Sequence, residues 1–271
     1  APAFAHRAPV RSNEANAIRA LGTPDREFES YSAVTWTDGV QRQYGLDSGV
    51  LRRLWLRDPK LQPASADSPR SIAEGFVSAH ATELGLDGAP AQVLALAYEK
   101  ASPSGTHFRW NQVVSGVPVY RSEIVVKVNR KGQVSSVQNN LRPNVKLDVT
   151  PALDKDAALN VAKNVVKPTG KALADAQAQL VVVDSRTGAR LAWIVDMPVE
   201  EPMGDWRVFV DAKSGAVRGA EDRMTNVDGS GRVFDPDPRS KMGDSTYVDN
   251  ADADSAVPFP GSYDIRVLPQ I

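Results

Sequence analysis

The sequence Phe108-Arg-Trp-Asn-Gln-Val-Val-Ser-Gly-Val-Pro-Val-Tyr120, continued by Ile124-Val-Val-Lys-Val-Asn-Arg-Lys-Gly-Gln-Val134, decides the fold. Large apolar residues alternate with polar ones in both halves, which is typical of strands with one buried face. Ser-Gly-Val-Pro at 115–118 interrupts the alternation, and Asn-Arg-Lys-Gly at 129–132 is a tight-turn sequence. The pattern predicts three antiparallel strands, at 107–113, 118–128 and 133–139.

A helix is predicted before these strands. Ser68-Pro69-Arg-Ser-Ile-Ala-Glu74 combines a proline at a first-turn position with capping-box spacing. The helix is expected to run to about Gly85, and its inward face should consist of Ile72, Phe76, His80 and Leu84. A further strand is predicted at 93–98, so this region should form one helix on an antiparallel sheet.

The second half of the chain repeats this plan. Thr150-Pro151 is predicted to open a helix that ends at Pro168, and strands are predicted at 179–184, 190–197 and 205–211. The inward face of this helix should consist of Leu153, Ala157, Val161 and Val165. The turns within 128–134 and 210–217 correspond, because each has a glycine where a positive φ costs little. The predicted fold class is therefore α+β, with two modules that each lay a helix on an antiparallel sheet.

The remaining segments differ in composition. Residues 1–23 are expected to form a poorly ordered arm or a surface strap, whereas the aromatic and leucine side chains of 27–57 must pack against something. Beyond residue 222 the sequence is rich in Gly, Asp and Pro, which indicates an irregular connector. We expect the arm and the packed segment at 1–69, a first module at 70–148, a second module at 149–223 and the connector at 224–271.

Composition narrows the function. The 271 residues are 42% hydrophobic and 24% charged, as in globular proteins with a real core. A net charge of −1 argues against nucleic acid or an anionic membrane surface as partner, and no apolar run could span a bilayer. Without cysteine, the chain has no disulfide or thiol nucleophile. The small-residue start suits an exported protein that has lost its signal peptide, although an arbitrary chain boundary would look the same.

The strand order resembles a known module. F-R-W-N-Q-x-x-x-G-V-P-V-Y, then an apolar strand and V-N-x-x-G-x-V, is similar to the propeptide of fungalysin- and thermolysin-type zinc metallopeptidases. The second module resembles the PepSY module that accompanies it in such propeptides, and the two resemblances cover residues 75–220 or so. The resemblance implies two modules of cystatin-like or PepSY type.

This resemblance implies that the chain acts on another polypeptide. The chain would be the propeptide of a secreted or periplasmic zinc metallopeptidase, helping the catalytic domain to fold and keeping it inactive. Its partner would be that catalytic domain, which would hold the zinc, and no cofactor is expected in this chain. A stand-alone secreted PepSY-type binding protein or peptidase inhibitor is an alternative, and an enzyme with an unrecognised site is a third. An H-E-x-x-H motif after residue 271 of the open reading frame would favour the propeptide.

The residues of a zinc peptidase are not found in this sequence. Such an enzyme needs H-E-x-x-H on a helix, because two imidazoles one turn apart hold the metal and the glutamate acts as general base. The chain has three histidines, His6, His80 and His107, and no two stand at that spacing. The sequence therefore predicts that this segment is not catalytic.

One acidic stretch shows part of a calcium-site pattern. Asn250, Asp252 and Asp254 alternate as in the first half of a calcium loop, where hard oxygen ligands surround the ion. Ser255 stands in place of the usual glycine, and Gly261 stands in place of the closing glutamate. A solvated acidic loop is therefore favoured, with calcium as the weaker alternative.

Candidate contacts with a partner lie in two places. Asn111 and Gln112 are polar residues in the aromatic strand, and Asn111 should point to the face opposite the aromatic side chains, which are expected to be core. The sequence G-R-V-F-D-P-D-P at 231–238 is similar to the segment after the prosegment in fungalysin-like proteins, so this connector is the best candidate to reach an active site. The partner-binding candidates are Asn111, Gln112, Gly116, Arg232, Phe234, Asp235 and Asp237.

Overall fold

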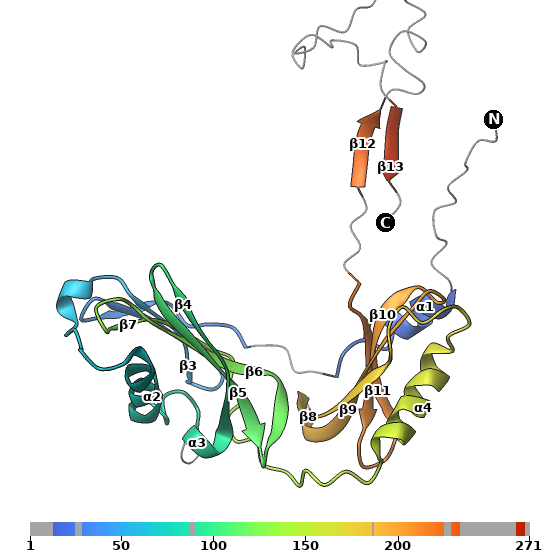
Figure 1. The fold of residues 1–271 in the computed structure, drawn as a ribbon, viewed down its shortest axis with the longest axis horizontal. Helices are drawn as coiled ribbons and strands as arrows, with labels where there is room; N and C mark the ends of the chain where they lie inside the picture. The colour runs from blue at the N-terminus through green and yellow to red at the C-terminus, as the bar shows by residue number, and fades with distance from the viewer. Residues whose placement is uncertain are drawn as a thin grey trace, which may run out of the picture. The chain divides into compact units, whose positions relative to one another are not determined.

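The computed structural model describes residues 13–24, 29–86, 90–185, 187–224, 229–233 and 264–268 (Figure 1). The chain divides into two compact units, Glu14–Asp222 and a smaller unit made of Ala1–Asn13 and Arg223–Ile271. The larger unit contains one large mixed sheet and few helices, so the predicted α+β class is confirmed.

The large sheet has 11 strands. The main path runs in the order β1-β2-β3-β7-β6-β8-β9-β10-β11, and β4 and β5 form a branch that joins it through β6. Among the described strands, only β6 and β8 pair in parallel. The strands are β1 Thr35–Thr37, β2 Val40–Tyr44, β3 Leu51–Leu56, β4 Leu94–Ser102, β5 Gly105–Val114, β6 Val117–Val128, β7 Val134–Asn139, β8 Gln177–Ser185, β9 Gly188–Val199, β10 Gly204–Asp211 and β11 Val217–Asp222.

The strands predicted from the opening stretch are confirmed. In register, Phe108 of β5 lies opposite Val126 of β6, which in turn lies opposite Val137 of β7. All three side chains are fully buried, as the alternation predicted. The turn between β5 and β6 is Ser115-Gly116, with positive φ angles of 48° and 83° that suit a two-residue hairpin.

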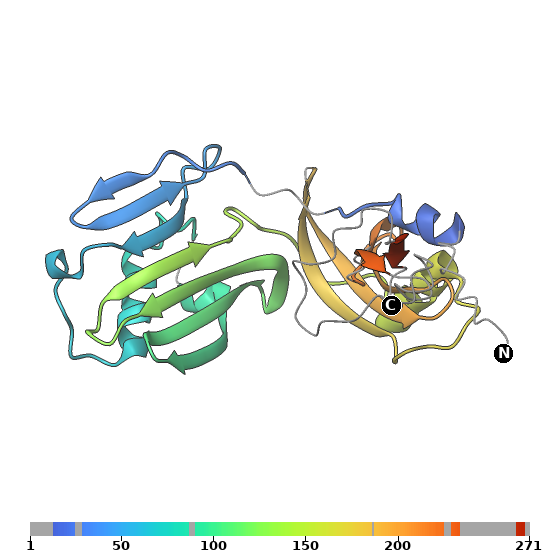
Figure 2. The ribbon, with the colours of Figure 1, turned by 90° about the horizontal axis from the view of Figure 1, so that it is seen from above.

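Residues 29–57 extend this sheet on the side of β7. β3 pairs with β7, and Leu54 lies opposite Val137. Leu51 and Leu54 belong to the same buried core as Phe108. Figure 2 shows β1–β3 in blue beside the green strands of the sheet. The expectation that this segment packs against the chain is confirmed for Leu51, Leu54 and Tyr44, but Trp36 is exposed. We call β1–β7 with helix α2 the N-terminal half-sheet.

Helix α2, Pro69–Ala79, covers one face of the N-terminal half-sheet, where it packs on β5, β6 and β7 (Figure 1). The Ser68 hydroxyl accepts a hydrogen bond from the Ser71 N–H at 3.1 Å, so Ser68 is the N-cap and Pro69 occupies the first turn as predicted. Glu74 pairs instead with Arg70, at 3.0 Å. The reciprocal bond of a capping box is therefore not formed.

The strands β8–β11, helix α4 (Lys155–Val166) and helix α1 (Asn13–Arg19) form what we call the C-terminal half-sheet. Its strands lie at the predicted positions. Helix α4 ends before Pro168 as predicted, but the predicted start at Thr150 is wrong. The Asp154 side chain accepts a hydrogen bond from Ala157 N–H at 2.8 Å, which makes Asp154 the N-cap.

In both helices, each residue that faces the core comes one position after a residue that was predicted to do so. Helix α2 buries Ala73 and Val77, and helix α4 buries Ala158, Ala162 and Val166. These side chains are small, so the helix backbone can lie close to the sheet. Of the residues predicted to face inward, those that pack at the edge of the cores instead are Ile72, Phe76, Leu153, Val161 and Val165.

Part of the predicted N-terminal arm is ordered structure. Helix α1 buries Ala15 and Ile18 in the core of the C-terminal half-sheet. Arg19 forms an ion pair with Asp222 at the end of β11 and lies 5.1 Å from the Trp206 ring centre. Of the two alternatives expected for residues 1–23, residues 13–19 therefore agree with the surface strap and not with the poorly ordered arm, because two apolar side chains on one helix face have a core to cover. Residues 1–12 lie outside the described residues.

In the smaller unit, β12 (Gly229–Val233) and β13 (Asp264–Leu268) form an antiparallel pair. Arg232 of β12 lies opposite Ile265 of β13. The expected irregular connector is therefore wrong for these two strands. The pairing joins segments about 30 residues apart in sequence, and neither Gly-Ser-Gly-Arg-Val nor Asp-Ile-Arg-Val-Leu gives a local signal of such a distant partner.

Candidate functional site

Gln112 is buried within the N-terminal half-sheet, with 7% of its surface exposed. Its Nε2 donates to the carbonyl oxygen of Arg142 at 2.8 Å, and its Oε1 accepts from the Arg142 N–H at 2.9 Å. The Ser122 hydroxyl also donates to this Oε1. The amide thus fastens β5 to the segment after β7, which accounts for a polar residue in this strand. A contact of Gln112 with a partner stays a prediction.

Two other candidates lie nearer the surface of the same strand pair. Asn111 is half-buried. Gly116 is exposed at the tip of the β5–β6 turn, where a Cβ atom would meet nothing within 4 Å. A hollow of about 420 Å³ next to this turn is lined in part by Ser115 and Lys146. Partner binding by Asn111 and Gly116 stays a prediction.

The connector candidates are placed only in part. Arg232 lies in β12, and Phe234, Asp235 and Asp237 come after it, outside the described residues. The calcium candidates, Asn250, Asp252 and Asp254, also lie outside them.

The two half-sheets meet at the N-terminal end of β6. Val119 pairs in parallel with Val182 of β8, and both are buried in a small apolar cluster with Leu191. The Tyr120 ring packs edge-on against Phe209 of β10, with the ring centres 5.4 Å apart. Apolar contact therefore links the half-sheets directly.

A polar network around Tyr120 reinforces this junction. The Tyr120 hydroxyl donates to Glu221 Oε1 at 3.1 Å and accepts from Arg207 Nη1 at 3.3 Å. Arg207 is itself held by two hydrogen bonds to Asp196, at 2.7 and 2.8 Å. The guanidinium of Arg121, a residue with a positive φ of 53°, also lies 5.1 Å from the Tyr120 ring centre. The network combines charged residues from β9, β10 and β11 with one tyrosine of β6.

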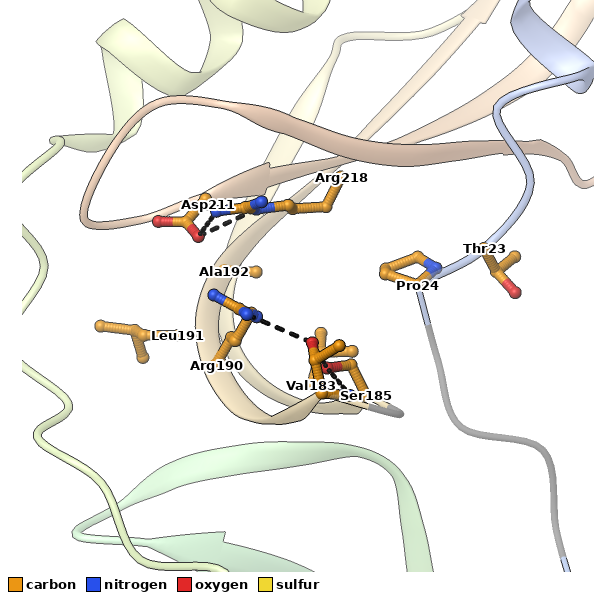
Figure 3. A pocket seen from close by; sticks show the side chains of 10 residues that line it. Thr23, Pro24, Val183, Ser185, Arg190, Leu191, Ala192, Asp211 and Arg218 are labelled. Carbon is orange, nitrogen blue, oxygen red and sulfur yellow. Dashed lines mark hydrogen bonds and ion pairs between the residues drawn. The ribbon is translucent and has the colours of Figure 1, made fainter.

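A cavity of about 530 Å³ opens beside the β8–β9 turn (Figure 3). The buried residues Val183 and Ala192 line it on the same face of the β8–β9 hairpin as Arg190, whereas the side chain of Leu191, which also borders it, points to the opposite face (Figure 3). The other lining residues, which are mostly polar, are Thr23, Pro24, Ser185, Thr187, Arg190, Asp211 and Arg218. A volume of this size is within the range of pockets that bind small ligands.

The Asp211 carboxylate at this cavity is bonded within the chain. Burial alone would raise the pKa of Asp211, but the N–H groups of Ser214 and Lys213 and the guanidinium of Arg218 lower it to about 2. Arg218 donates from Nε and Nη2 to Oδ2 at 3.0 and 2.8 Å. The carboxylate is therefore ionised at neutral pH, and the charges of Asp211 and Arg218 cancel.

Arg190 has a different environment. Its side chain is exposed, and its Nη2 donates to Thr187 Oγ1 at 3.2 Å. Within the described ranges of the chain, no carboxylate forms an ion pair with Arg190. Figure 3 shows its guanidinium at the cavity together with the Asp211–Arg218 pair. The cavity thus carries one positive charge that no described residue neutralises.

The described residues contain no group of three or more His, Cys, Asp or Glu side chains that could hold a metal ion. In the same part of the chain, no helix has the length and apolar character needed to cross a membrane.

Comparison with known proteins places the opening stretch in a known motif. Residues 100–141 match the family model of the Fungalysin/Thermolysin Propeptide Motif. They contain all of β5, β6 and β7, the strands on which the sequence resemblance rested. The resemblance to this propeptide motif is therefore confirmed for these residues.

Curated relatives support the same similarity. The chain is 26% identical over 155 residues to the bacillolysin of Bacillus subtilis (strain 168), with 53% of this chain and 30% of that protein covered. It is 27% identical over 141 residues to neutral protease B of the same strain, with 50% and 26% covered. The chain thus spans about 30% of the length of these relatives. Among solved structures, the Bacillus megaterium YpeB C-terminal domain has a TM-score of 0.35 and 12% identity, over 80% of this chain and 97% of that one.

The sequence did not predict the cavity residues Arg190, Asp211 and Arg218. One signal was available: the strand–turn–strand pattern at 210–217 implied that residues just before and after this turn lie close together. No local pattern indicated that Arg190, on another hairpin, faces the same cavity.

Proposed function

We propose that this chain is the propeptide of a secreted zinc metallopeptidase and acts as its folding aid and inhibitor. The match of residues 100–141 to the propeptide motif carries this proposal. The similarity to bacillolysin and neutral protease B, proteins of which this chain spans about 30%, supports it. The partner would be the catalytic domain of the same precursor, holding the zinc.

The fold suits a protein that works by offering surfaces. Its strands present a preformed sheet on which a catalytic domain can nucleate, which would lower a folding barrier without any chemistry by the chain itself. Inhibition requires a segment that reaches into the active-site cleft. The connector after Met224 is our candidate, and the PepSY-type module and the extracytoplasmic location belong to this same proposal.

The experiment is inhibition in trans. The polypeptide 1–271 is added to the separately purified mature peptidase of its own precursor, and cleavage of a casein substrate is monitored. A covalent link raises the effective concentration to roughly millimolar, so its loss should weaken the complex without abolishing it. We expect inhibition at micromolar concentration or below.

A version that ends at Arg223 serves as the matched variant. It keeps both half-sheets and lacks β12 and β13, so it should still bind but inhibit less than the longer version. Equal inhibition by both versions would place the blocking segment in the half-sheets. If neither version binds the folded enzyme, the propeptide proposal is wrong and a stand-alone binding protein takes its place.

A further inference from the structure

We propose that the cavity between the β8–β9 turn and the Asp211–Arg218 pair is a binding site for a short peptide segment that carries a carboxylate. This site belongs to the C-terminal half-sheet, outside the matched propeptide motif at 100–141. It does not depend on the proposed function, because a propeptide and a stand-alone binding protein could both use it.

Charge is the first argument. The guanidinium groups of Arg190 and Arg218 and the carboxylate of Asp211 all line the cavity (Figure 3). Asp211 accepts two hydrogen bonds from Arg218. Because the pKa of Asp211 is lowered to about 2, this pair is ionised at neutral pH. The charge of Arg190 remains uncompensated among the described residues. A guanidinium donates to a carboxylate in a planar, two-bond geometry, which makes a carboxylate the ligand that best fits this excess.

The hydrogen bonds around Arg190 are the second argument. Thr187 Oγ1 accepts one bond from Nη2 of Arg190 at 3.2 Å, which restrains the guanidinium and leaves its remaining N–H groups for a ligand. Thr187 and Ser185 also bond to each other through their hydroxyls, at 3.1 Å. The group is thus partly ordered before any ligand arrives, which lowers the entropy lost on binding.

The apolar wall is the third argument. Val183 of β8 and Ala192 of β9 are buried residues that line the cavity on the same face of the hairpin as Arg190. A free inorganic anion would leave this wall without contacts, whereas a peptide can place an aliphatic side chain against it. A cavity of about 530 Å³ has room for a few residues. The ligand class is therefore a peptide with an aliphatic residue next to an acidic one.

The test uses two capped peptides and the whole chain. Acetyl-Ala-Val-Glu-amide and acetyl-Ala-Val-Gln-amide are titrated into isotope-labelled 1–271, and amide chemical shifts are recorded. We expect the Glu peptide to bind with a dissociation constant of about 1 mM or tighter, moving the resonances of Thr187, Arg190 and Ala192. The Gln peptide should bind at least about ten-fold more weakly, because it cannot form the charge-assisted pair.

Variants distinguish peptide binding at this site from nonspecific electrostatic attraction of an anion to the protein. Arg190→Ala should weaken binding of the Glu peptide about ten-fold or more, and Arg190→Lys should restore only part of it, since lysine lacks the planar fork. Arg130→Ala removes another exposed arginine, from the β6–β7 turn, and should change nothing. An unchanged thermal midpoint in all variants shows that the fold persists.

The proposal is overturned by any of four results, three with the peptides and one with phosphate. In the first, the Glu peptide fails to bind wild-type protein at about 10 mM, a concentration ten-fold above the expected dissociation constant. In the second, the Glu peptide binds Arg190→Ala as tightly as it binds wild type. In the third, the Gln peptide binds wild type as tightly as the Glu peptide does. Inorganic phosphate serves as a further probe: phosphate binding at Arg190 that is as tight as the peptide's would reject a peptide site in favour of a simple anion site.

Discussion

The two half-sheets share one plan but depend on the N-terminal chain in different ways. In each, a helix with small inward side chains covers antiparallel strands, and an aromatic residue from a strand fills the core, Phe108 in one and Trp206 in the other. The N-terminal half-sheet is completed by three more strands from 35–56, whereas the C-terminal one is completed by helix α1 from 13–19. The N-terminal half-sheet is therefore continuous in sequence from β1 to β7, whereas the C-terminal half-sheet combines helix α1 with a segment that follows β7.

This comparison shows where the stability of each half-sheet originates. The N-terminal half-sheet contains a buried ion pair from its added segment, in which Glu29 and Arg52 side chains are 10% and 7% exposed. In the C-terminal half-sheet, the added segment contributes the Arg19–Asp222 pair and an edge contact, because the Ala220 N–H donates to the Gly22 carbonyl at 2.7 Å. Substitutions in the two half-sheets should therefore lower the free energy of unfolding by different amounts and with different dependence on pH.

The largest effect is expected from Trp110→Ala in the N-terminal half-sheet. Trp110 is 6% exposed and stacks on Phe108, with the ring centres 5.7 Å apart. Removing the ring should lower the free energy of unfolding by about 3–5 kcal/mol, as measured by urea denaturation. Trp36→Ala is the control, because Trp36 is 62% exposed and its removal should cost less than about 0.5 kcal/mol. Similar losses in both variants would show that Trp110 is not part of the core.

Acid should weaken the N-terminal half-sheet through Glu29. Burial would raise the pKa of Glu29, but hydrogen bonds from Ser48 and Arg52 lower it from 4.5 to about 2. The folded state therefore binds this proton less readily than the unfolded state, so the stabilisation is complete above pH 4.5 and is lost as the pH falls toward 2. The loss should reach up to about 3 kcal/mol for this group.

Glu29→Gln isolates that contribution from the other carboxyl groups. The variant should be less stable than wild type at neutral pH, and its stability should fall less on acidification from about pH 5 to about pH 3 in urea denaturation experiments. If the two proteins lose stability in parallel on acidification, Glu29 does not titrate with a lowered pKa. Hydrogen exchange at β3 and β7 would report whether the loss is confined to the N-terminal half-sheet.

A smaller effect is expected at the junction of the half-sheets. Tyr120→Phe keeps the ring contact with Phe209 but removes the hydroxyl that bonds to Glu221 and Arg207. The free energy of unfolding should fall by about 0.5–1.5 kcal/mol. Tyr98→Phe is the matched control on an exposed strand and should have no measurable effect. Separate unfolding transitions for the two half-sheets in Tyr120→Phe, with one transition in wild type, would show that this network couples them.

The sequence predicted the strands well and the helix faces poorly, for one physical reason. Strand alternation has a period of two, so Phe108 and Trp110 could be assigned to one face from their nearest neighbours. Helix faces were chosen by the largest apolar residues, such as Phe76 and Val161. The faces that are fully buried instead contain the small residues Ala73 and Ala158.

The candidate site was predictable only in part. The turn at 210–217 implied that Asp211 and Arg218 lie near each other, since a tight turn with a glycine brings its flanking strands together. Arg190 had no such signal, because its approach depends on how β9 pairs with β10. Gln112 was chosen as a surface contact, and only the position of Arg142 explains why its amide is buried.

The sequence by itself determined most strands and helices between residues 69 and 211, the turns and the resemblance to a propeptide motif. These features depend on residues a few positions apart, whose side chains and backbone preferences act locally. Only the tertiary structure decided that helix α1 completes the distant C-terminal half-sheet, that β12 pairs with β13, and that Arg190 joins Asp211 and Arg218 at one cavity. Contacts between distant segments depend on which surfaces bury the most apolar area together, and a local pattern does not encode that choice.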